Sequence, residues 1–260
     1  MKIYTKEGLI NSLREIKNQG WILTGRKGND GGVGNTLEDL LGVEENNLPI
    51  PNAAEWELKA QRKTTTALVT LFHMEPSPRA CKFVPAMLLP LYGWRHDEAG
   101  KLYSENELSF RQTIHGLSRS DRGFKVVVNR NEQKIQISFD SKAVDQRHSE
   151  WLEKVEKRVG LEELNPQPYW GFDDLFHKAG TKLPNCFFAE AETKLENGQE
   201  FFLYTNIYML KRFDIAKFLE GIESGNILID FDARTGHNHG TKFRLRKKYL
   251  KFLYAESIEL

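Results

Sequence analysis

An acid, an acid and a lysine alternate along the segment AEWELKA, and their spacing is the first chemical feature of the chain. In an extended strand, side chains two residues apart point to the same side, so Glu55, Glu57 and Lys59 would share one face. Trp56 and Leu58 would share the opposite face. Carboxylates hold Mg²⁺ through hard oxygen ligands, and a lysine ammonium can orient a water molecule or meet a phosphate oxygen. The spacing therefore suits a phosphodiesterase site, and its alternative is a solvated strand face.

A carboxylate two residues before a lysine is not specific by itself, because the pattern occurs five times in the chain. Glu57 and Lys59 differ from the other pairs in context. A Pro-containing turn precedes them, the apolar segment ALVTLF follows them, and an upstream helical segment offers a further acid in Glu38. This context favours the pair at 57 and 59 as the one that carries chemistry.

Other kinds of site are disfavoured by their missing motifs. The Gly-rich loop LTGRKGNDGGVGNT lacks the GxxxxGK[ST] pattern of a nucleotide-binding P-loop. No GxSxG occurs, which argues against a serine hydrolase of the nucleophile-elbow type. His237 and His239 have no nearby Cys, so the spacing favours a polar or hydrogen-bonding pair over a zinc site.

Charge and composition limit the class of protein. The net charge of +1 argues against binding a polyanion over the whole surface. The segment RTGHNHGTKFRLRKKYLK is nevertheless rich in Lys and Arg and contains no acid, so one face of the carboxyl-terminal region is expected to be basic. The amino terminus has an amphipathic pattern rather than that of a secretory signal, and no run reaches the ~18 apolar residues of a membrane span. We expect a cytoplasmic protein that does not bind membranes, with Cys81 and Cys186 as reduced core thiols.

Hydrophobic periodicity predicts a mixed α/β chain. We expect helices over 5–19 and 216–222, strands over 54–60, 66–74 and 226–234, and a hairpin of 185–193 with 200–210. A short helix is expected at NTLEDLLG, with Thr36 as its N-cap and Leu37, Leu40 and Leu41 facing the interior. Four prolines predict irregular structure over 75–120.

The order of these pieces resembles the MvaI/BcnI family of type II restriction endonucleases, a branch of the PD-(D/E)xK nucleases related to MutH. The likeness is carried by GVGNTLEDLLGVEENNLPIPNAAEWELKAQR, LVTLFHMEP, FFAEAETKLENGQEFF and IDFDARTGHNHGTKFRL, and is weakest over 85–170. The resemblance implies a PD-(D/E)xK restriction-endonuclease-like core, a mixed sheet flanked by helices, in two lobes around a DNA-binding cleft. We expect 1–120 to be mainly catalytic and 121–260 mainly DNA-recognition, with lobes that are discontinuous in sequence.

Carried over by position, the resemblance implies that Glu57 and Lys59 form the ExK motif and that Glu38 is the helix acid. The first acid of the family pattern falls at position 52, where this chain has Asn52. The implied Mg²⁺ ligands are then Glu57, Asn52 and Glu38. Glu55 either compensates for the missing carboxylate or only flanks the site.

The resemblance also implies a set of DNA-reading residues near the carboxyl terminus. These are Asp232, Arg234, His237, His239, Lys242 and Arg244. Arginine can bridge guanine O6 and N7, and an acid can accept a hydrogen bond from cytosine N4. His73 is expected close to both the metal site and the bases.

The implied function is Mg²⁺-dependent, sequence-specific hydrolysis of double-stranded DNA at a short CCNGG-like site by a monomer. A cognate DNA methyltransferase is expected as a genetic companion and not as a bound subunit. Two alternatives remain open at this point: a MutH-like nicking endonuclease, and a non-cleaving sequence-specific DNA-binding protein, the latter motivated by Asn52.

Overall fold

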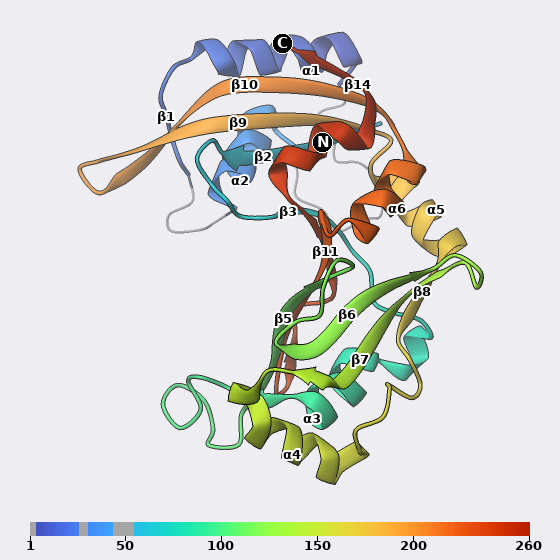
Figure 1. The fold of residues 1–260 in the computed structure, drawn as a ribbon. Coiled ribbons are helices and arrows are strands. Elements are labelled where there is room, and N and C mark those ends of the chain that lie inside the picture. Colours follow the sequence, from blue (N-terminus) through green and yellow to red (C-terminus); the bar gives the residue numbers. More distant parts are fainter. Residues whose placement is uncertain (1–3, 26–30, 44–54) are drawn as a thin grey trace. The chain divides into compact units, whose positions relative to one another are not determined.

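A computed structural model describes residues 4–25, 31–43 and 55–260. Asn52 lies outside these ranges. The chain forms two compact units (Figure 1). Unit 1 comprises Met1–Val69, His177–Ile215 and Lys247–Leu260, and unit 2 comprises Thr70–Phe176 and Ala216–Arg246. Each unit draws on both halves of the sequence.

Unit 1 is built around one sheet with strand order β1-β10-β9-β2, and β14 also pairs with β10. β2 and β9 are parallel, and the other pairs are antiparallel. Its elements are α1 (Lys6–Asn18), β1 (Ile22–Leu23), α2 (Gly32–Leu41), β2 (Trp56–Arg62), the carboxyl-terminal part of α5 (Phe172–Lys182), β9 (Asn185–Glu196), β10 (Gln199–Phe213), the 3₁₀ segment η4 (Lys247–Leu253) and β14 (Tyr254–Glu259).

Unit 2 contains two sheets, with strand orders β3-β13-β11-β5-β4 and β6-β7-β8. Its strands are β3 (Val69–His73), β4 (Trp94–Arg95), β5 (Leu108–His115), β6 (Arg122–Asn129), β7 (Lys134–Val144), β8 (Tyr169–Gly171), β11 (Ile227–Arg234), β12 (His237–Asn238) and β13 (Lys242–Leu245). Its helical segments are η1 (Arg79–Cys81), η2 (Val84–Leu88), α3 (Leu89–Tyr92), η3 (Gln146–His148), α4 (Ser149–Val159) and α6 (Ile215–Glu223).

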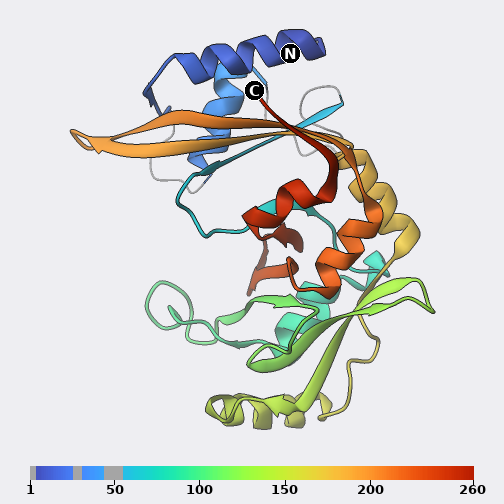
Figure 2. The same cartoon turned by 45° about the horizontal axis from the view of Figure 1, so that its top comes forward.

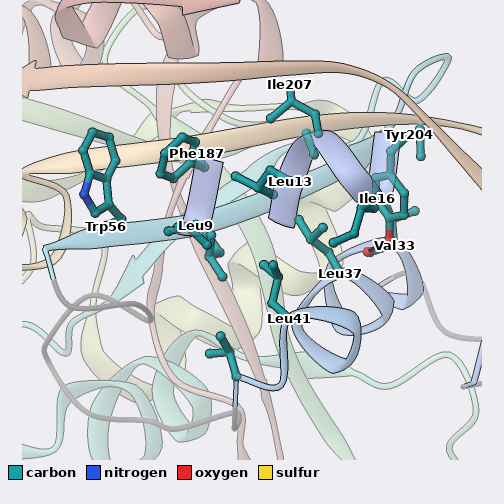
Figure 3. Close-up of a cluster of buried hydrophobic side chains, with 14 of the residues drawn as sticks. Leu9, Leu13, Ile16, Val33, Leu37, Leu41, Trp56, Phe187, Tyr204 and Ile207 are labelled. Carbon is teal, nitrogen blue, oxygen red and sulfur yellow. Dashed lines mark hydrogen bonds between the residues drawn. The ribbon is translucent and has the colours of Figure 1, made fainter. Parts of the chain in front are cut away.

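The core of unit 1 lies between helices α1 and α2 and one face of the sheet (Figure 3). Leu9 and Leu13 of α1 and Leu37 of α2 pack with Trp56 and Phe187 of the sheet. The Trp56 and Phe187 ring centroids are 4.5 Å apart. Trp56 and Leu58, which were expected to share one face of the strand, are both buried in this cluster.

The predicted hairpin is present as β9 and β10, and it extends beyond the helices at its turn in both views (Figures 1 and 2). Asn197 and Gly198 at the turn both have positive φ, at 52° and 74°. This backbone conformation matches the twist of the strands, and Asn-Gly is the residue pair that adopts it at least cost.

Helix α2 is present where a short helix was predicted, but its first residue and its buried leucines differ from the prediction. It begins at Gly32, four residues before Thr36, so Thr36 is an interior residue and not the N-cap. The buried Thr36 hydroxyl instead forms a hydrogen bond with the Thr24 hydroxyl at 3.1 Å. Leu37 and Leu41 are buried, four residues apart on one stripe, whereas Leu40 lies off this stripe and is 39% exposed.

Two further expectations are wrong. Residues 75–120 are not irregular throughout, because they contain the eight-residue strand β5. Cys81 is exposed, and only Cys186 is a core thiol. None of the helices in the described ranges has the length and apolar character that crossing a membrane requires.

Candidate active site and recognition face

Glu57 and Lys59 lie on the face of the unit 1 sheet that is opposite the Trp56 face. In the parallel register of β2 and β9, Glu57 is next to Cys186 and Lys59 is next to Phe188. Glu57 is only 3% exposed. The alternative of a solvated strand face does not hold, because this carboxylate is among the most buried charged groups of the described chain.

Two ammonium groups hold the buried carboxylate. Lys59 Nζ is 3.1 Å from Glu57 Oε1, and Lys182 Nζ is 3.0 Å from Glu57 Oε2. Lys182 is the last residue of α5, which leads within three residues into β9, the strand that pairs with β2. A buried carboxylate is costly unless it is paired, so each lysine stabilises one oxygen of the same group.

The groups next to Glu57 stay protonated. Burial raises the pKa of the Cys186 thiol to about 12, with the negative charge of Glu57 adding to the rise and the positive charge of Lys59 opposing it. Burial, followed by the proximity of Cys186 and Glu57, raises the pKa of Tyr254 well above its usual value. Neither Cys186 nor Tyr254 is therefore a ready nucleophile at neutral pH.

A second ion pair lies further along β9, where Lys247 of η4 approaches the sheet. Lys247 Nζ is 2.9 Å from Glu190 Oε1, and it also donates a hydrogen bond to the Lys63 carbonyl oxygen at 2.6 Å. Asn206 donates to Glu190 Oε2 at 3.2 Å. Lys247 thus ties the carboxyl-terminal segment to the polar face of the unit 1 sheet.

The expected metal ligands are only partly accounted for. Glu57 offers a hard oxygen donor, Glu55 lies exposed in the turn before β2, and Glu38 lies on α2, the helix that packs on the core face. Within the described ranges, no three His, Cys, Asp or Glu side chains converge as a metal cluster would. Mg²⁺ often takes only one or two protein carboxylates, completing its shell with water and substrate phosphates. Glu57 would fit such an ion as a single carboxylate ligand once Lys59 or Lys182 gives up one of its oxygens.

Four of the six predicted DNA-reading residues, Asp232, Arg234, Lys242 and Arg244, lie on one polar face of unit 2. Along β11, Asp230, Asp232 and Arg234 alternate with the buried side chains of Ile229 and Phe231. Two neighbouring strands complete the face. β13 contributes Lys242 and Arg244, and β5 contributes Arg111, Thr113 and His115. We call these eight residues the recognition face.

Cross-strand ion pairs order this face. Asp230 accepts a hydrogen bond from Thr113 at 2.7 Å on Oδ1 and one from Arg244 at 3.2 Å on Oδ2. Asp232 has Lys242 Nζ at 3.2 Å from Oδ2 and Arg111 Nε at 3.5 Å from Oδ1. Burial alone would raise the pKa of Asp232, but the hydrogen bond and charge of Lys242, together with the charges of Arg111 and His239, lower it below its usual value.

Arg234 is held at the end of the face. Its Nη1 is 3.0 Å from Glu107 Oε1, a carboxylate whose side chain is 7% exposed, and its guanidinium lies 4.5 Å from the Tyr103 ring centroid. These two contacts fix the direction of the guanidinium.

The three predicted histidines all lie in or beside unit 2 strands. His237 and His239 contact each other nearly edge to face, with ring centroids 4.2 Å apart, and the His239 amide donates to the Asp232 carbonyl oxygen at 3.0 Å. His73 ends β3 near Gly240, since a Cβ placed on that glycine would be 3.4 Å from the imidazole Cδ2. His73 thus belongs to the same unit as the recognition face, whereas Glu57 belongs to unit 1.

Sequence reasoning missed Lys182 and all of β5. No local pattern marks Lys182, because its role depends on the pairing of β9 with β2. The sequence of β5 does contain a strand pattern. In LSFRQTIH, the buried Phe110 and Ile114 alternate with Arg111, Thr113 and His115, which is the period of a half-buried strand.

Comparison with solved structures finds the same architecture in a restriction endonuclease. The chain is similar to restriction endonuclease MvaI in a complex with its cognate DNA substrate, with 25% identity, a TM-score of 0.77, and coverage of 98% of this chain and 99% of that one. It is also similar to MvaI in the absence of DNA, with 26% identity, a TM-score of 0.53, and coverage of 100% and 99%. A comparison with curated proteins finds no match.

A family model extends the likeness to the sequence. The model of the MvaI/BcnI restriction endonuclease family matches residues 10–254, which is nearly the whole chain. These findings confirm the predicted resemblance, the α/β fold class and the enzyme class of site-specific deoxyribonuclease. The chain belongs to the MvaI/BcnI restriction endonuclease family.

Proposed function

We propose that this protein is a Mg²⁺-dependent type II restriction endonuclease that hydrolyses both strands of duplex DNA at a short CCNGG-like sequence. The observation that carries the proposal is the buried Glu57 carboxylate, which lies between two lysines on the polar face of a sheet. We further propose that it acts as a monomer in the cytoplasm, beside a methyltransferase that protects the same sequence.

In this proposal the residues of unit 1 perform hydrolysis. Glu57 would hold the metal ion, with Asn52 and Glu38 as further candidate ligands and Glu55 as a reserve carboxylate. When bound, Mg²⁺ polarises the phosphate and lowers the pKa of a coordinated water molecule. Lys59 offsets the negative charge that develops on the phosphate oxygens as water attacks phosphorus and the 3′ oxygen leaves. The products are 5′-phosphate and 3′-hydroxyl ends.

The residues of unit 2 read the sequence. Asp232 would accept a hydrogen bond from cytosine N4, and Arg234 and Arg244 would donate to guanine O6 and N7. His73, His237, His239 and Lys242 are the other candidates for base or phosphate contacts. The similar structure, a restriction endonuclease in a complex with its cognate DNA substrate, supports DNA as the partner.

Plasmid cleavage tests the proposal. Supercoiled plasmid is incubated with the protein with and without Mg²⁺, and the ends of any products are mapped. Discrete fragments that need Mg²⁺ support the proposal. Only open circles would indicate a MutH-like nicking enzyme, and retarded but intact DNA would indicate a binding protein without cleavage.

Two variants connect the activity to the site. Lys59→Ala should lose cleavage by several orders of magnitude while keeping DNA affinity, because the lost contact acts mainly in the transition state. Glu57→Gln should lose cleavage as well. Lys63→Ala is the matched control, because Lys63 forms an exposed ion pair with Glu192 in the same unit. Normal cleavage by Lys59→Ala would overturn the assignment.

Asn52, which stands where the family pattern has an acid, is the reason for considering a DNA-binding protein that does not cleave. An amide oxygen can coordinate Mg²⁺, but replacing a carboxylate removes one negative charge from the ligand set. We propose that the parent protein is active, and that Asn52→Asp lowers the Mg²⁺ concentration at half-maximal cleavage. A silent parent beside an active Asn52→Asp would instead identify an inert DNA-binding protein. Glu55→Ala shows whether that acid takes part.

A further inference from the structure

Asp232 stands between two cations on the recognition face. Arg111 of β5 is its direct neighbour in the antiparallel register, and Lys242 reaches it from β13. Each cation contacts a different carboxylate oxygen, Arg111 Nε at 3.5 Å from Oδ1 and Lys242 Nζ at 3.2 Å from Oδ2. Both oxygens of Asp232 are therefore engaged in the structure.

The two cations are not held equally. The Lys242 side chain is 19% exposed and donates a hydrogen bond to Asp232, whereas the Arg111 side chain is 76% exposed and its contact is longer. An exposed, loosely made ion pair contributes little, so separating Arg111 from Asp232 costs less than separating Lys242. Oδ1 of Asp232 is consequently the oxygen that can accept a hydrogen bond from a ligand once Arg111 moves away.

The other two arginines of the face have firmer partners. Arg234 is bound to the buried Glu107, and Arg244 is bound to Asp230, whose side chain is 12% exposed. The Arg244 side chain is 28% exposed and that of Arg234 is 32% exposed. Among the arginines of the recognition face, Arg111 therefore combines the largest exposure with the most exposed carboxylate partner.

A C·G base pair offers partners for both Asp232 and Arg111 once the two side chains separate. When a carboxylate accepts from cytosine N4, the O6 and N7 acceptors of the paired guanine lie beside it in the major groove. We propose that Arg111 leaves Asp232 on DNA binding and donates to the guanine paired with the cytosine that Asp232 reads. The two residues would then read both halves of one C·G pair. This inference rests on the proposed function, because it assumes sequence-specific DNA binding through Asp232.

A 7-deazaguanine scan tests the assignment by binding alone. The N7 acceptor is removed from one guanine at a time in a duplex that carries the mapped cleavage site, and affinities are measured without Mg²⁺. The wild-type protein should lose affinity about tenfold at the guanine that Arg111 reads. Arg111→Ala should bind the normal site about tenfold more weakly, lose nothing further at that guanine, and keep its sensitivity at the others.

Two comparisons make the result decisive. Arg130→Ala is the matched control, because Arg130 is 60% exposed and paired with Glu223 in the same unit. It should behave as wild type. Arg111→Lys keeps the positive charge but loses the planar guanidinium that can donate two parallel hydrogen bonds to guanine. This variant should therefore bind the site as weakly as Arg111→Ala does, while its affinity for random duplex stays normal.

Several outcomes would overturn the inference. Arg111→Ala could remain sensitive at every guanine where the wild type is sensitive, or it could lose equal affinity for random duplex, which would make Arg111 a backbone contact. Full affinity of Arg111→Lys would show that charge alone matters. Failure of the proposed function is seen separately and earlier, because the plasmid assay would then yield no double-strand cleavage site to map before any Arg111 variant is made.

Discussion

The ammonium group of Lys182, at the end of α5, lies 3.0 Å from Oε2 of Glu57, while Lys59 occupies the other oxygen of the same carboxylate. Two positive charges thus surround one negative charge in a largely buried position. The local excess of positive charge suits a site that must receive a phosphate group. The arrangement also makes Lys182 important for the stability of unit 1.

Removal of Lys182 should destabilise the protein. Lys182→Met leaves Glu57 with Lys59 as its one remaining ion-pair partner among the described residues, and an undercompensated buried acceptor costs about 1–3 kcal/mol. Lys63→Met, which breaks an exposed ion pair with Glu192, should change the free energy of unfolding far less. Urea unfolding of both variants measures the difference. Adding Glu57→Gln to Lys182→Met should recover part of the loss, and equal losses for the two lysines would contradict the buried-pair explanation.

Arg244 and Lys248 should differ in how they affect DNA binding. Arg244→Ala should cost about 1–3 kcal/mol at the cognate site and little on random duplex, as expected of a base contact. Lys248 is an exposed residue of η4 and should contact a DNA phosphate. Lys248→Ala should therefore weaken binding to the cognate site and to random duplex alike. It should also lower the slope of log affinity against log salt concentration by about 1. Titrations at several salt concentrations separate the two. If Arg244→Ala weakens both duplexes alike, Arg244 contacts the backbone.

Asp230 should act through Arg244. Its carboxylate accepts from Thr113 and Arg244 and is nearly buried, so its role is to position the guanidinium. Asp230→Asn should weaken cognate binding by about 1–3 kcal/mol, and combining it with Arg244→Ala should add little, because residues that act as a unit are not additive. Fully additive losses in this double-mutant cycle would show that Asp230 and Arg244 act independently.

His115 should make stability fall in mild acid. Burial, with the charges of Arg246 and Lys125 adding to it, lowers the pKa of His115 in the folded protein. Below the unfolded value of about 6.5, the unfolded chain binds a proton that the folded protein does not, so stability declines as pH falls from there to the folded pKa. His115→Asn should remove this part of the pH dependence. Urea unfolding at intervals between pH 8 and pH 5 compares the variant with the parent, and identical slopes would refute the prediction.

The two cysteines should react at very different rates. Cys81 is exposed, whereas Cys186 is buried with its pKa raised to about 12, so its thiolate is scarce at neutral pH. Ellman's reagent should react quickly with one thiol, that of Cys81, in the native wild-type protein. In the native Cys81→Ser variant it should react quickly with no thiol. Urea should release the second thiol. A fast native reaction of the Cys81→Ser variant would show that the Cys186 site opens readily.

The elements that follow from local patterns were the predictable ones. The amphipathic α1, the alternation of Trp56 with Glu57 in β2, and the Asn197–Gly198 turn of the hairpin each depend on residues close in sequence. The boundaries of α2 were not predicted correctly. A threonine that looks like an N-cap is instead satisfied by Thr24, a partner that becomes available only through tertiary packing.

The parts of the candidate site that were missed depend on distant partners. Lys182 reaches Glu57 across 125 positions of sequence only because α5 leads into the strand that pairs with β2. β5 was hidden for a different reason. Pro76 and Pro78 lie outside helices and strands, whereas Pro85 and Pro90 lie in the first turns of the helical segments η2 and α3. All four precede β5, and their influence was extended too far along the chain.

The two-sided unit 1 sheet restricts how β2 can change in length. Its residues alternate strictly between the core face and the polar face, from Trp56 and Glu57 onward. Deleting or inserting one residue within the strand would exchange the two sets, burying a charge among apolar side chains and exposing Leu58 or Trp56 to the opposite face. Changes of two residues would preserve the alternation. Libraries that vary this family member by insertion or deletion should therefore recover even-numbered changes in β2, and odd-numbered changes only in the segments that flank it.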